Sequence, residues 1–318
     1  MAKKYTNTGN KDTRSGFGAG LLEAGRKNPN IVALTADLLG SVKMDAFAKE
    51  FPHRFFQCGI AEANMIGAAA GLAITGKVAF ASSFAEFVTG RVYDQIRQEV
   101  AYGHTNVKVC ASHAGITLGE DGATHQTMED IALMRALPGM VVINPCDYNQ
   151  CKAATLAIAE YEGPVYLRFG RPTMPNFTPE DQVFEIGKAI CLNEGTDVTI
   201  FATGHLVWEA VNAAELLEAE GISAEVIDIA TIKPLDVEAV VASARKTGAV
   251  VCAEEHNMCG GLGELIAGVL AANAPTLIEY VNGADRFGQS GTPGELMKAY
   301  GLDAAHIVEA AKRAVSRK

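Results

Sequence analysis

Short runs of β-branched and other apolar residues recur along the first half of the chain, and longer stretches with helical spacing separate them. We predict strands from the runs and amphipathic helices from the stretches between them. The predicted strands cover residues 31–35, 78–82, 107–110, 141–144 and 165–168. Helical periodicity occupies roughly residues 14–28, 61–74, 86–102 and 148–160. This alternation is typical of a parallel sheet that is covered by helices.

The same alternation returns after a break in the pattern. Residues 170–185 are polar and contain Pro172, Pro175 and Pro179, which suits an extended connection. Beyond this break, strands are predicted at 198–202, 224–229, 249–253 and 276–280, and helices at about 206–220, 237–246, 263–272 and 304–315. We therefore predict two tandem doubly wound α/β domains with mainly parallel sheets. The first covers residues 1–170, a linker covers 171–189, and the second covers 190–318.

Composition and charge narrow the class of protein. With 48% hydrophobic and 20% charged residues, the chain is neither disordered nor of low complexity. Its 37 acidic and 27 basic residues give a net charge of −10, which disfavours nucleic acid as a partner. The most apolar stretch, 65–88, is interrupted by Gly76 and Lys77, so we predict no membrane span. The first residues, MAKKYTNTGNKD, lack an apolar segment, and we expect a cytoplasmic location.

Seven cysteines occur without any C-x-x-C pair, and most of them lie in apolar segments. We therefore predict reduced core cysteines and no structural zinc or disulfides. The candidates are Cys58, Cys110, Cys146, Cys151, Cys191, Cys252 and Cys259.

Two glycine-rich segments invite a comparison with phosphate-binding loops. Gly16-Phe-Gly-Ala-Gly20 follows a polar run rather than a strand, so we expect close helix packing there instead of a dinucleotide site. Gly260-Gly-Leu-Gly263 follows a predicted strand and opens a helix. This segment is compatible either with an anion held by helix N–H groups or with a tight packed turn.

Chemistry-bearing residues gather after three predicted strands of the first domain. The segment 112–126 contains two histidines, two carboxylates and several glycines directly after a strand, where ligands bind in such sheets. Glu62 opens a helix rich in small apolar residues, and Phe84 and Phe87 follow another strand. Taken singly, a carboxylate in the first helical turn favours the helix dipole, and two phenylalanines are most often core residues.

Read together in chain order, several of these segments resemble the transketolase family. The segments are Ala36-Asp-Leu38, 59–65, 83–87, Gly119-Glu-Asp-Gly-Ala-Thr-His-Gln126, Leu167-Arg168, Ala253-Glu-Glu-His256 and Gly260-Gly-Leu-Gly263. The resemblance covers nearly all 318 residues and corresponds to the pyrimidine-binding and C-terminal domains of that family. Full-length members also carry an N-terminal domain with a G-D-G motif, which this sequence does not supply. The chain therefore resembles one subunit of a split transketolase.

The resemblance implies thiamine diphosphate as cofactor. Glu62 would be catalytic and would contact the aminopyrimidine ring, while Phe84 and Phe87 would pack on that ring and Asp37 would also contact the cofactor. Mg²⁺ or Ca²⁺ is expected on a partner subunit that binds the diphosphate, and no metal is expected on this chain. At Gly90 the sequence departs from relatives that carry another aromatic residue.

The resemblance also implies a phosphosugar site. Arg14, Ser41, His113 and Arg168 match residues that hold the substrate phosphate, since two guanidinium groups suit a phosphate dianion. Asp121 and His125 match residues that face the substrate hydroxyls, with His125 as a catalytic hydrogen-bond donor or proton shuttle. An isolated arginine, however, more often forms a surface ion pair.

The activity that the resemblance implies is the transfer of a two-carbon ketol unit from a ketose to an aldose, as in carbohydrate metabolism of the pentose-phosphate type. Self-association is expected because the helix at 63–74 is too apolar for an exposed surface, and pairing with an N-terminal subunit would give a heterotetramer. The alternatives are a β subunit of a 2-oxoacid dehydrogenase, a deoxyxylulose-phosphate synthase fragment and a non-catalytic binding subunit.

Overall fold

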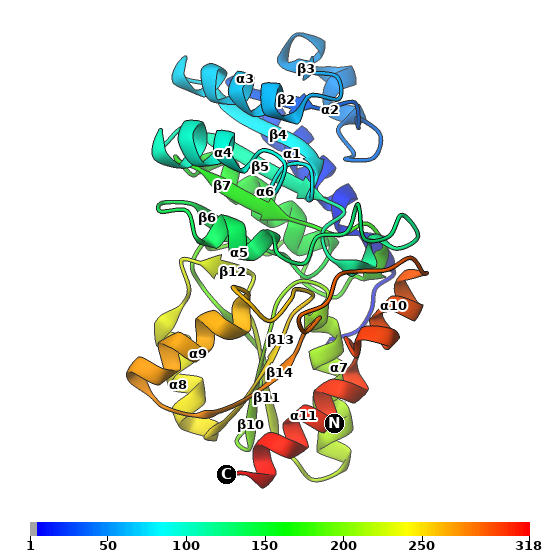
Figure 1. The fold of residues 1–318 in the computed structure, drawn as a ribbon, viewed down its shortest axis with the longest axis vertical. Helices are drawn as coiled ribbons and strands as arrows, with labels where there is room; N and C mark the ends of the chain where they lie inside the picture. Colours follow the sequence, from blue (N-terminus) through cyan, green and yellow to red (C-terminus); the bar gives the residue numbers. More distant parts are fainter. Residues whose placement is uncertain (1–4) are drawn as a thin grey trace.

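The structure is a computed structural model that describes residues 5–318, and its two large sheets lie one below the other along the long axis of the molecule (Figure 1). The larger sheet has the strand order β12-β6-β7-β5-β4-β2-β3. Its strands are β2 (Ile31–Thr35), β3 (Phe55–Gln57), β4 (Val78–Phe84), β5 (Val107–Ser112), β6 (Val141–Ile143), β7 (Val165–Arg168) and β12 (Thr231–Lys233). All neighbours in it are parallel except β12 and β6. The predicted parallel sheet is confirmed.

Helices cover both faces of this sheet (Figure 1). One face carries α1 (Thr13–Lys27), α2 (Asp45–Glu50) and α6 (Tyr148–Glu160). The other carries α3 (Glu62–Ile74), α4 (Tyr93–Gln95), its π-helical continuation Ile96–Tyr102, and α5 (Asp130–Arg135). The helix predicted over 86–102 is wrong in its first part. Residues 86–92 form consecutive turns around Gly90, a residue that disfavours helix.

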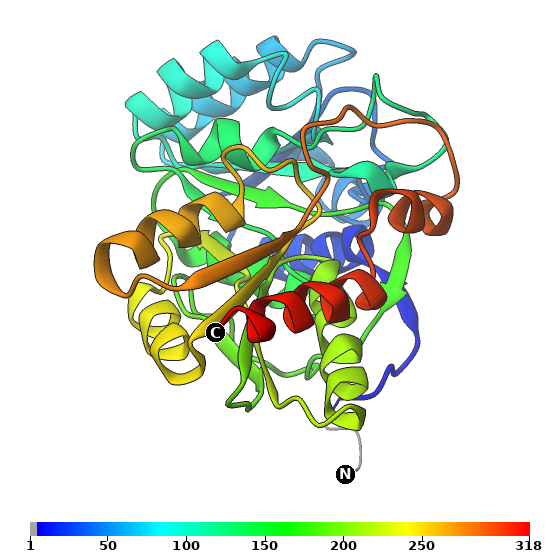
Figure 2. The same ribbon diagram turned by 60° about the horizontal axis from the view of Figure 1, so that its bottom comes forward.

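The smaller sheet has the strand order β14-β13-β10-β11-β9, and only β9 is antiparallel to its neighbour. Its strands are β9 (Ile190–Asn193), β10 (Val198–Ala202), β11 (Ala224–Asp228), β13 (Ala249–Ala253) and β14 (Leu277–Val281). Two helices lie on each face (Figure 2), namely α7 (Leu206–Ala219) with α11 (Ala304–Ser316), and α8 (Val237–Thr247) with α9 (Leu262–Asn273).

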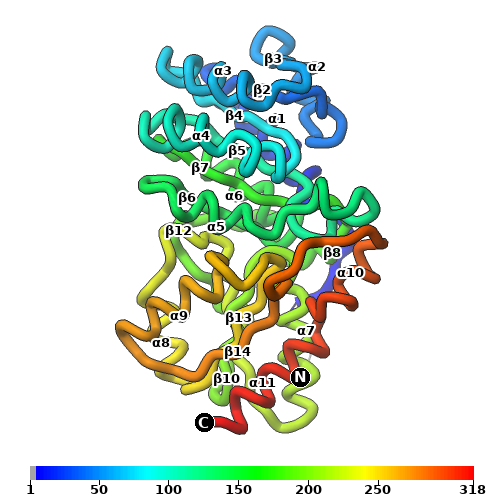
Figure 3. The backbone as a smooth tube through the Cα atoms, in the orientation of Figure 1, coloured from blue at the N-terminus to red at the C-terminus, as the bar shows by residue number. Residues whose placement is uncertain are grey.

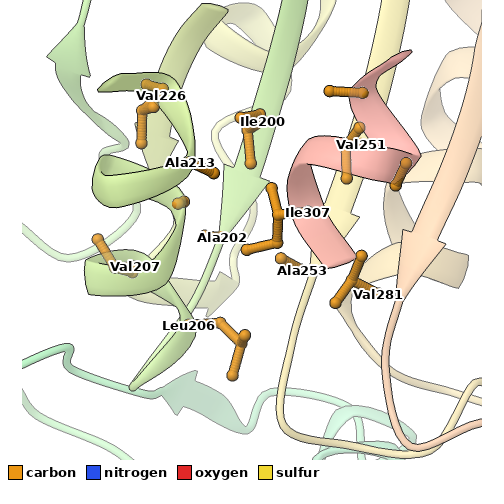
Figure 4. Packing of buried hydrophobic residues seen from close by; sticks show 14 of the residues in the cluster. Ile200, Ala202, Leu206, Val207, Ala213, Val226, Val251, Ala253, Val281 and Ile307 are labelled. Atoms are coloured by element: carbon orange, nitrogen blue, oxygen red, sulfur yellow. The ribbon is translucent and has the colours of Figure 1, made fainter. Parts of the chain in front are cut away.

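The core beneath α7 and α11 shows how this sheet is held. Ile200 and Ala202 of β10 and Val251 of β13 point toward Ile307 of α11, and Leu206 begins α7 beside them (Figure 4). Small residues on the strands let the two helices approach closely, and the enclosed side chains are fully buried. This packing joins both helices to one face of the second sheet.

Two short strands make pairings that the sequence does not predict. Within the predicted linker, β8 (Thr173–Pro175) pairs antiparallel with β1 (Asn10–Asp12), and Figure 3 shows this segment beside the N-terminal strand. In addition, β12 leaves the second half and joins the first sheet beside β6. Neither strand has a run of apolar residues long enough to be predicted.

Local signals explain where helices begin. Asp12 and Asp147 accept hydrogen bonds from backbone N–H groups at the starts of α1 and α6, as N-cap residues do. A complete capping box of Thr292 and Glu295 starts α10 (Pro293–Tyr300), a helix that periodicity alone did not predict.

The close packing expected of Gly16 and Gly20 is confirmed. A Cβ on Gly16 would lie 2.4 Å from the Tyr148 carbonyl oxygen, and one on Gly20 would lie 2.7 Å from Thr155 Cβ. Both contacts join α1 to α6, so these glycines serve helix packing.

The cysteine prediction is confirmed for most positions. All seven are free thiols; four are buried, Cys58 and Cys191 are half-buried, and Cys259 is exposed. Within residues 5–318, none of the helices has the length and apolar character that a membrane crossing requires.

Candidate functional site

Most of the candidate residues lie where strands of the first sheet end. The loop after β2 carries Asp37 and Ser41, β4 ends at Phe84, and His113 follows β5. Glu62 opens α3 shortly after β3. Because β2, β3, β4 and β5 are parallel neighbours, their carboxyl ends meet at one edge of the sheet, where α/β proteins bind ligands.

Glu62 is a buried carboxylate that pairs with Arg91. It is 4% exposed, although Ala63 and Asn64, which follow it on α3, are exposed. Arg91 Nη1 donates to both carboxylate oxygens of Glu62 at 3.2 Å. The guanidinium also lies 4.1 Å above the ring centroid of Phe87. A buried carboxylate beside an aromatic face suits a flat, nitrogen-rich ring.

Phe84 and Phe87 form an aromatic wall between Arg91, the partner of Glu62, and the two histidines. Phe84 and Phe87 are nearly parallel, with ring centroids 5.7 Å apart. His125 contacts Phe87 edge-on at 5.4 Å, and His113 stacks on Phe84 at 3.8 Å. Thr124 Oγ1 lies 2.9 Å from His125 Nδ1. The structure therefore brings Phe84, Phe87, His113 and His125 together.

His113 is kept neutral by its surroundings. Burial, with Arg14, Arg171, His125 and Lys43 nearby, lowers the pKa of His113 to about 3. Its Nε2 lies 3.5 Å from Arg14 Nη1, and its Nδ1 lies 2.7 Å from Ser112 Oγ. Since arginine only donates, Nε2 is the acceptor, and the neutral ring carries its proton on Nδ1.

Two arginines lie beside His113, and the sequence predicted one of them. Arg14 donates to the Ser41 carbonyl oxygen at 3.1 Å, and its Nε lies 3.3 Å from Asp12. Burial lowers the pKa of Arg14, and the positive charge of Arg171 acts in the same direction. Arg171 is held by Glu120 at 2.8 Å and by the Leu118 carbonyl oxygen at 2.7 Å. The pair offers the positive charge that a phosphate or sulfonate group needs.

Arg168 does not join this group, contrary to the sequence prediction. Its side chain is 3% exposed and donates to Asp130 at 2.7 Å and to the Glu255 carbonyl oxygen at 2.9 Å. Tyr166 also donates to Asp130, at 2.6 Å. Burial alone would raise the pKa of Asp130, but Arg168 holds it below its usual range. Arg168 thus links the halves of the chain, and Arg171, three residues later, provides the second guanidinium.

The two predicted aspartates lie on exposed loops. Asp37 is exposed, and its backbone N–H donates to Gln57 Oε1 at 2.6 Å. Asp121 is exposed on the loop that also carries His125. That loop is anchored by the buried Gln126, which donates to the Gln289 carbonyl oxygen of the second half at 3.0 Å. No contact of these two carboxylates with the aromatic wall is among those that the structure records for residues 5–318.

Backbone conformation marks the same edge of the sheet. Asp37, Lys43 and His113 adopt φ of about 60°, an unfavourable region for residues other than glycine. They are three of the five such residues in the part of the chain that the structure describes, and the others are His104 and Ala284. Such strain persists only where the surroundings impose it, which is common at ligand sites.

The second glycine-rich segment holds an internal carboxylate. Glu254 accepts hydrogen bonds from the N–H groups of Leu262 at 2.7 Å and of Gly263 at 2.8 Å, at the start of α9. A Cβ on Gly261 would lie 2.3 Å from Glu254 Oε2. The chain's own side chain therefore fills the anion position that the sequence left open.

One group of potential metal ligands occurs among residues 5–318, formed by Cys191, Glu194 and Glu225. Lys246 forms ion pairs with both glutamates, so an ammonium group already neutralises them.

Fold and site together define a two-part α/β protein whose first sheet carries an aromatic and carboxylate site at its carboxyl edge. Comparison with known proteins agrees with this class. Residues 10–176 match the model of the transketolase pyrimidine-binding domain, and residues 187–307 match that of the transketolase C-terminal domain. The chain belongs to the transketolase family and corresponds to its C-terminal half.

Three similar proteins illustrate the match. A protein of Methanocaldococcus jannaschii with the provisional name of transketolase C-terminal section is 51% identical, over 94% of this chain and 95% of its own. The 6-deoxy-6-sulfo-D-fructose transketolase subunit of a Clostridium species is 46% identical, over 94% and 92%. A solved structure described as a split gene transketolase, inactive beta4 tetramer, superposes with a TM-score of 0.90 at 48% identity, over 96% and 98%.

Proposed function

We propose that this chain is the pyrimidine-binding subunit of a thiamine-diphosphate-dependent transketolase that moves a two-carbon ketol unit between sugars. The observation that supports this most directly is Glu62, a buried carboxylate whose partner Arg91 lies over Phe87 of the aromatic wall. This donor set fits an aminopyrimidine ring, which needs one hydrogen-bonding carboxyl group and an apolar face.

Thiamine diphosphate would supply the nucleophilic carbon and the electron sink that cleavage of a carbon–carbon bond next to a carbonyl requires. Glu62 would hold a proton at a pyrimidine nitrogen, and aspartate would be too short for that contact. Phe84 and Phe87 would exclude water from this hydrogen bond, which strengthens it. His125, half-buried against Phe87, would donate to or accept from the substrate oxygen near the reacting carbon.

The substrate would carry an anionic terminal group. Arg14 and Arg171 flank the neutral His113, so a phosphate or sulfonate there would meet two guanidinium groups. A relative named for a sulfonated sugar is consistent with a sulfonate at this position. In this proposal Ser41, whose carbonyl oxygen accepts from Arg14, contacts the same anion, Asp121 faces the sugar hydroxyls, and Asp37 contacts the cofactor.

A second chain would complete the site. We propose that an N-terminal transketolase subunit holds the diphosphate and its Mg²⁺ or Ca²⁺, consistent with the split-gene description of a similar structure. The exposed side of α3 suits an interface between subunits, because Ile60 and Ile74 near its ends are 79% and 78% exposed, with small residues between them. A homodimer of this chain with two N-terminal subunits would give a heterotetramer.

Reconstitution tests the proposal. The chain is mixed with candidate N-terminal subunits, thiamine diphosphate and magnesium, and ketol transfer from phosphorylated and sulfonated ketoses to aldoses is measured. We expect turnover with one partner and none with either chain alone. Ketol transfer by this chain alone would contradict the split site, and absence of turnover with every partner would favour a non-catalytic binding subunit.

A further inference from the structure

Arg91 lies where the proposed function requires the cofactor ring. Its Nη1 donates to both oxygens of Glu62 at 3.2 Å, so it uses the carboxylate that would receive the ring nitrogen. Its guanidinium carbon lies 4.1 Å from the centroid of Phe87, so it also covers a face of the aromatic wall. One flat cationic group thereby makes both contacts that a flat nitrogen heterocycle would make.

The arrangement of Arg91 suits a displaceable group. The side chain of Arg91 is 51% exposed, whereas that of its partner Glu62 is 4% exposed. The arginine follows Gly90 in a segment of turns rather than in a helix. Because the exposed guanidinium regains water when it moves outward, breaking this pair costs a modest amount of free energy, which the ring's own contacts with Glu62 and Phe87 can supply. The buried carboxylate, in contrast, needs a partner at all times.

We propose that Arg91 is an internal surrogate for the aminopyrimidine ring, which satisfies Glu62 in the cofactor-free subunit and is displaced when the cofactor binds. This inference rests on the proposed function, because that function places the ring between Glu62 and Phe87. Its consequence is a barrier to cofactor binding that the chain itself supplies. The isolated subunit thus keeps its catalytic carboxylate paired until a complete site forms.

The test compares cofactor binding by three variants in the reconstituted complex. Arg91→Met keeps the length and the apolar contact with Phe87 but removes the charge and the donors. Arg91→Lys keeps the charge without the flat fork. Arg97→Met is the matched control, since Arg97 is exposed on the nearby helix Ile96–Tyr102 and no hydrogen bond or ion pair of its side chain is recorded within residues 5–318. Thiamine diphosphate binding is measured by calorimetry and its association rate by stopped flow.

We expect Arg91→Met to bind thiamine diphosphate more tightly and faster, by roughly tenfold, the factor for one exposed ion pair and one cation–π contact that need not be broken. Arg91→Lys should lie between the parent and Arg91→Met, and Arg97→Met should match the parent. Unchanged or weaker binding by Arg91→Met, with normal binding by the parent complex, would overturn the inference alone. A parent complex that does not bind the cofactor at all would overturn both the inference and the proposed function.

Discussion

The carboxyl edges of the two parallel sheets carry similar residues but make opposite use of them. At the first edge, Arg14, His113 and Arg171 leave a cationic group beside an aromatic wall, with the arginines only partly buried. At the second edge, the polar side chains are buried and bonded within the chain. Glu255 accepts from the Thr117 N–H at 2.7 Å, and Asp228 accepts from Gln150 at 2.5 Å.

The difference teaches which edge carries the site. The second edge is docked on the first half of the chain, and its polar side chains form hydrogen bonds across the contact between the halves. At the first edge, Arg14 and Arg171 do not bond across this contact, so their positive charges remain available to a ligand. Sheet topology alone marks both edges as candidate sites, and the pairing of each side chain decides between them.

Replacing Arg168 is expected to have the largest effect of these tests, and the effect is on the free energy of unfolding. Arg168→Met leaves Asp130 buried without its ion-pair partner, which should cost about 3–5 kcal/mol. Urea unfolding followed by circular dichroism should show a lower midpoint. Arg171→Met should unfold at nearly the parental midpoint, because its ion pair with Glu120 is exposed. An unchanged midpoint together with a raised KM for phosphosugars would return Arg168 to the substrate site.

Arg171 provides the complementary test. In the reconstituted enzyme, Arg171→Met should raise the KM for a phosphorylated or sulfonated sugar by roughly tenfold or more, since a charge-assisted contact is lost. The KM for the corresponding uncharged sugar should change little. Steady-state kinetics with both sugars makes the comparison, and equal losses for both would mean that Arg171 supports the loop rather than the anion.

At the second edge, Asp228 should make the stability of the chain depend on pH. Burial raises the pKa of Asp228 to about 7, with Asp147 acting in the same direction. The folded chain therefore binds a proton that the unfolded chain lacks between about pH 4 and pH 7, and stability falls as pH rises through this window. Asp228→Asn should raise Tm by several degrees at pH 8 and hardly at all at pH 4. An equal shift at both values would contradict the assigned ionisation.

His113 shows the opposite behaviour at the first edge. Because its pKa is about 3 in the folded chain and about 6.5 when unfolded, its contribution to stability is lost as pH falls from 6.5 toward 3. An anion that neutralises Arg14 and Arg171 should raise this pKa. Histidine ¹H–¹³C spectra with and without inorganic phosphate measure the shift. Titration of His113 near pH 6.5 without phosphate would contradict its burial among cationic groups.

The sequence predicts strands that have their own apolar pattern, and it misses strands that form only by pairing with distant segments. Strands such as β4 and β10 were predictable because their apolar runs are short and buried on both faces. The additions β8 and β12 have three residues each and depend on partners far away in the chain. No local pattern indicates such pairing.

The site divides in the same way. Glu62, Phe84, Phe87, His113 and His125 stand in segments that resemble a known family, and the structure places four of them against one another and Glu62 beside Arg91. Arg168 was assigned wrongly because the sequence shows two arginines three residues apart and does not show which one is buried. The extent of the apolar run 165–168 could have separated them, since Arg168 ends a strand that is buried throughout and Arg171 lies in the bend after it.

The central claim is that Glu62 activates a thiamine cofactor, and hydrogen exchange at the thiazolium C2 position measures this most directly. Glu62→Gln keeps the shape and a hydrogen bond but cannot supply a carboxylic acid. In the reconstituted complex, the variant should slow C2 deuterium exchange, followed by NMR, by about 10²-fold or more while its unfolding midpoint stays near the parental value. Exchange at the parental rate in Glu62→Gln would show that this glutamate only begins a helix, and the account would fail.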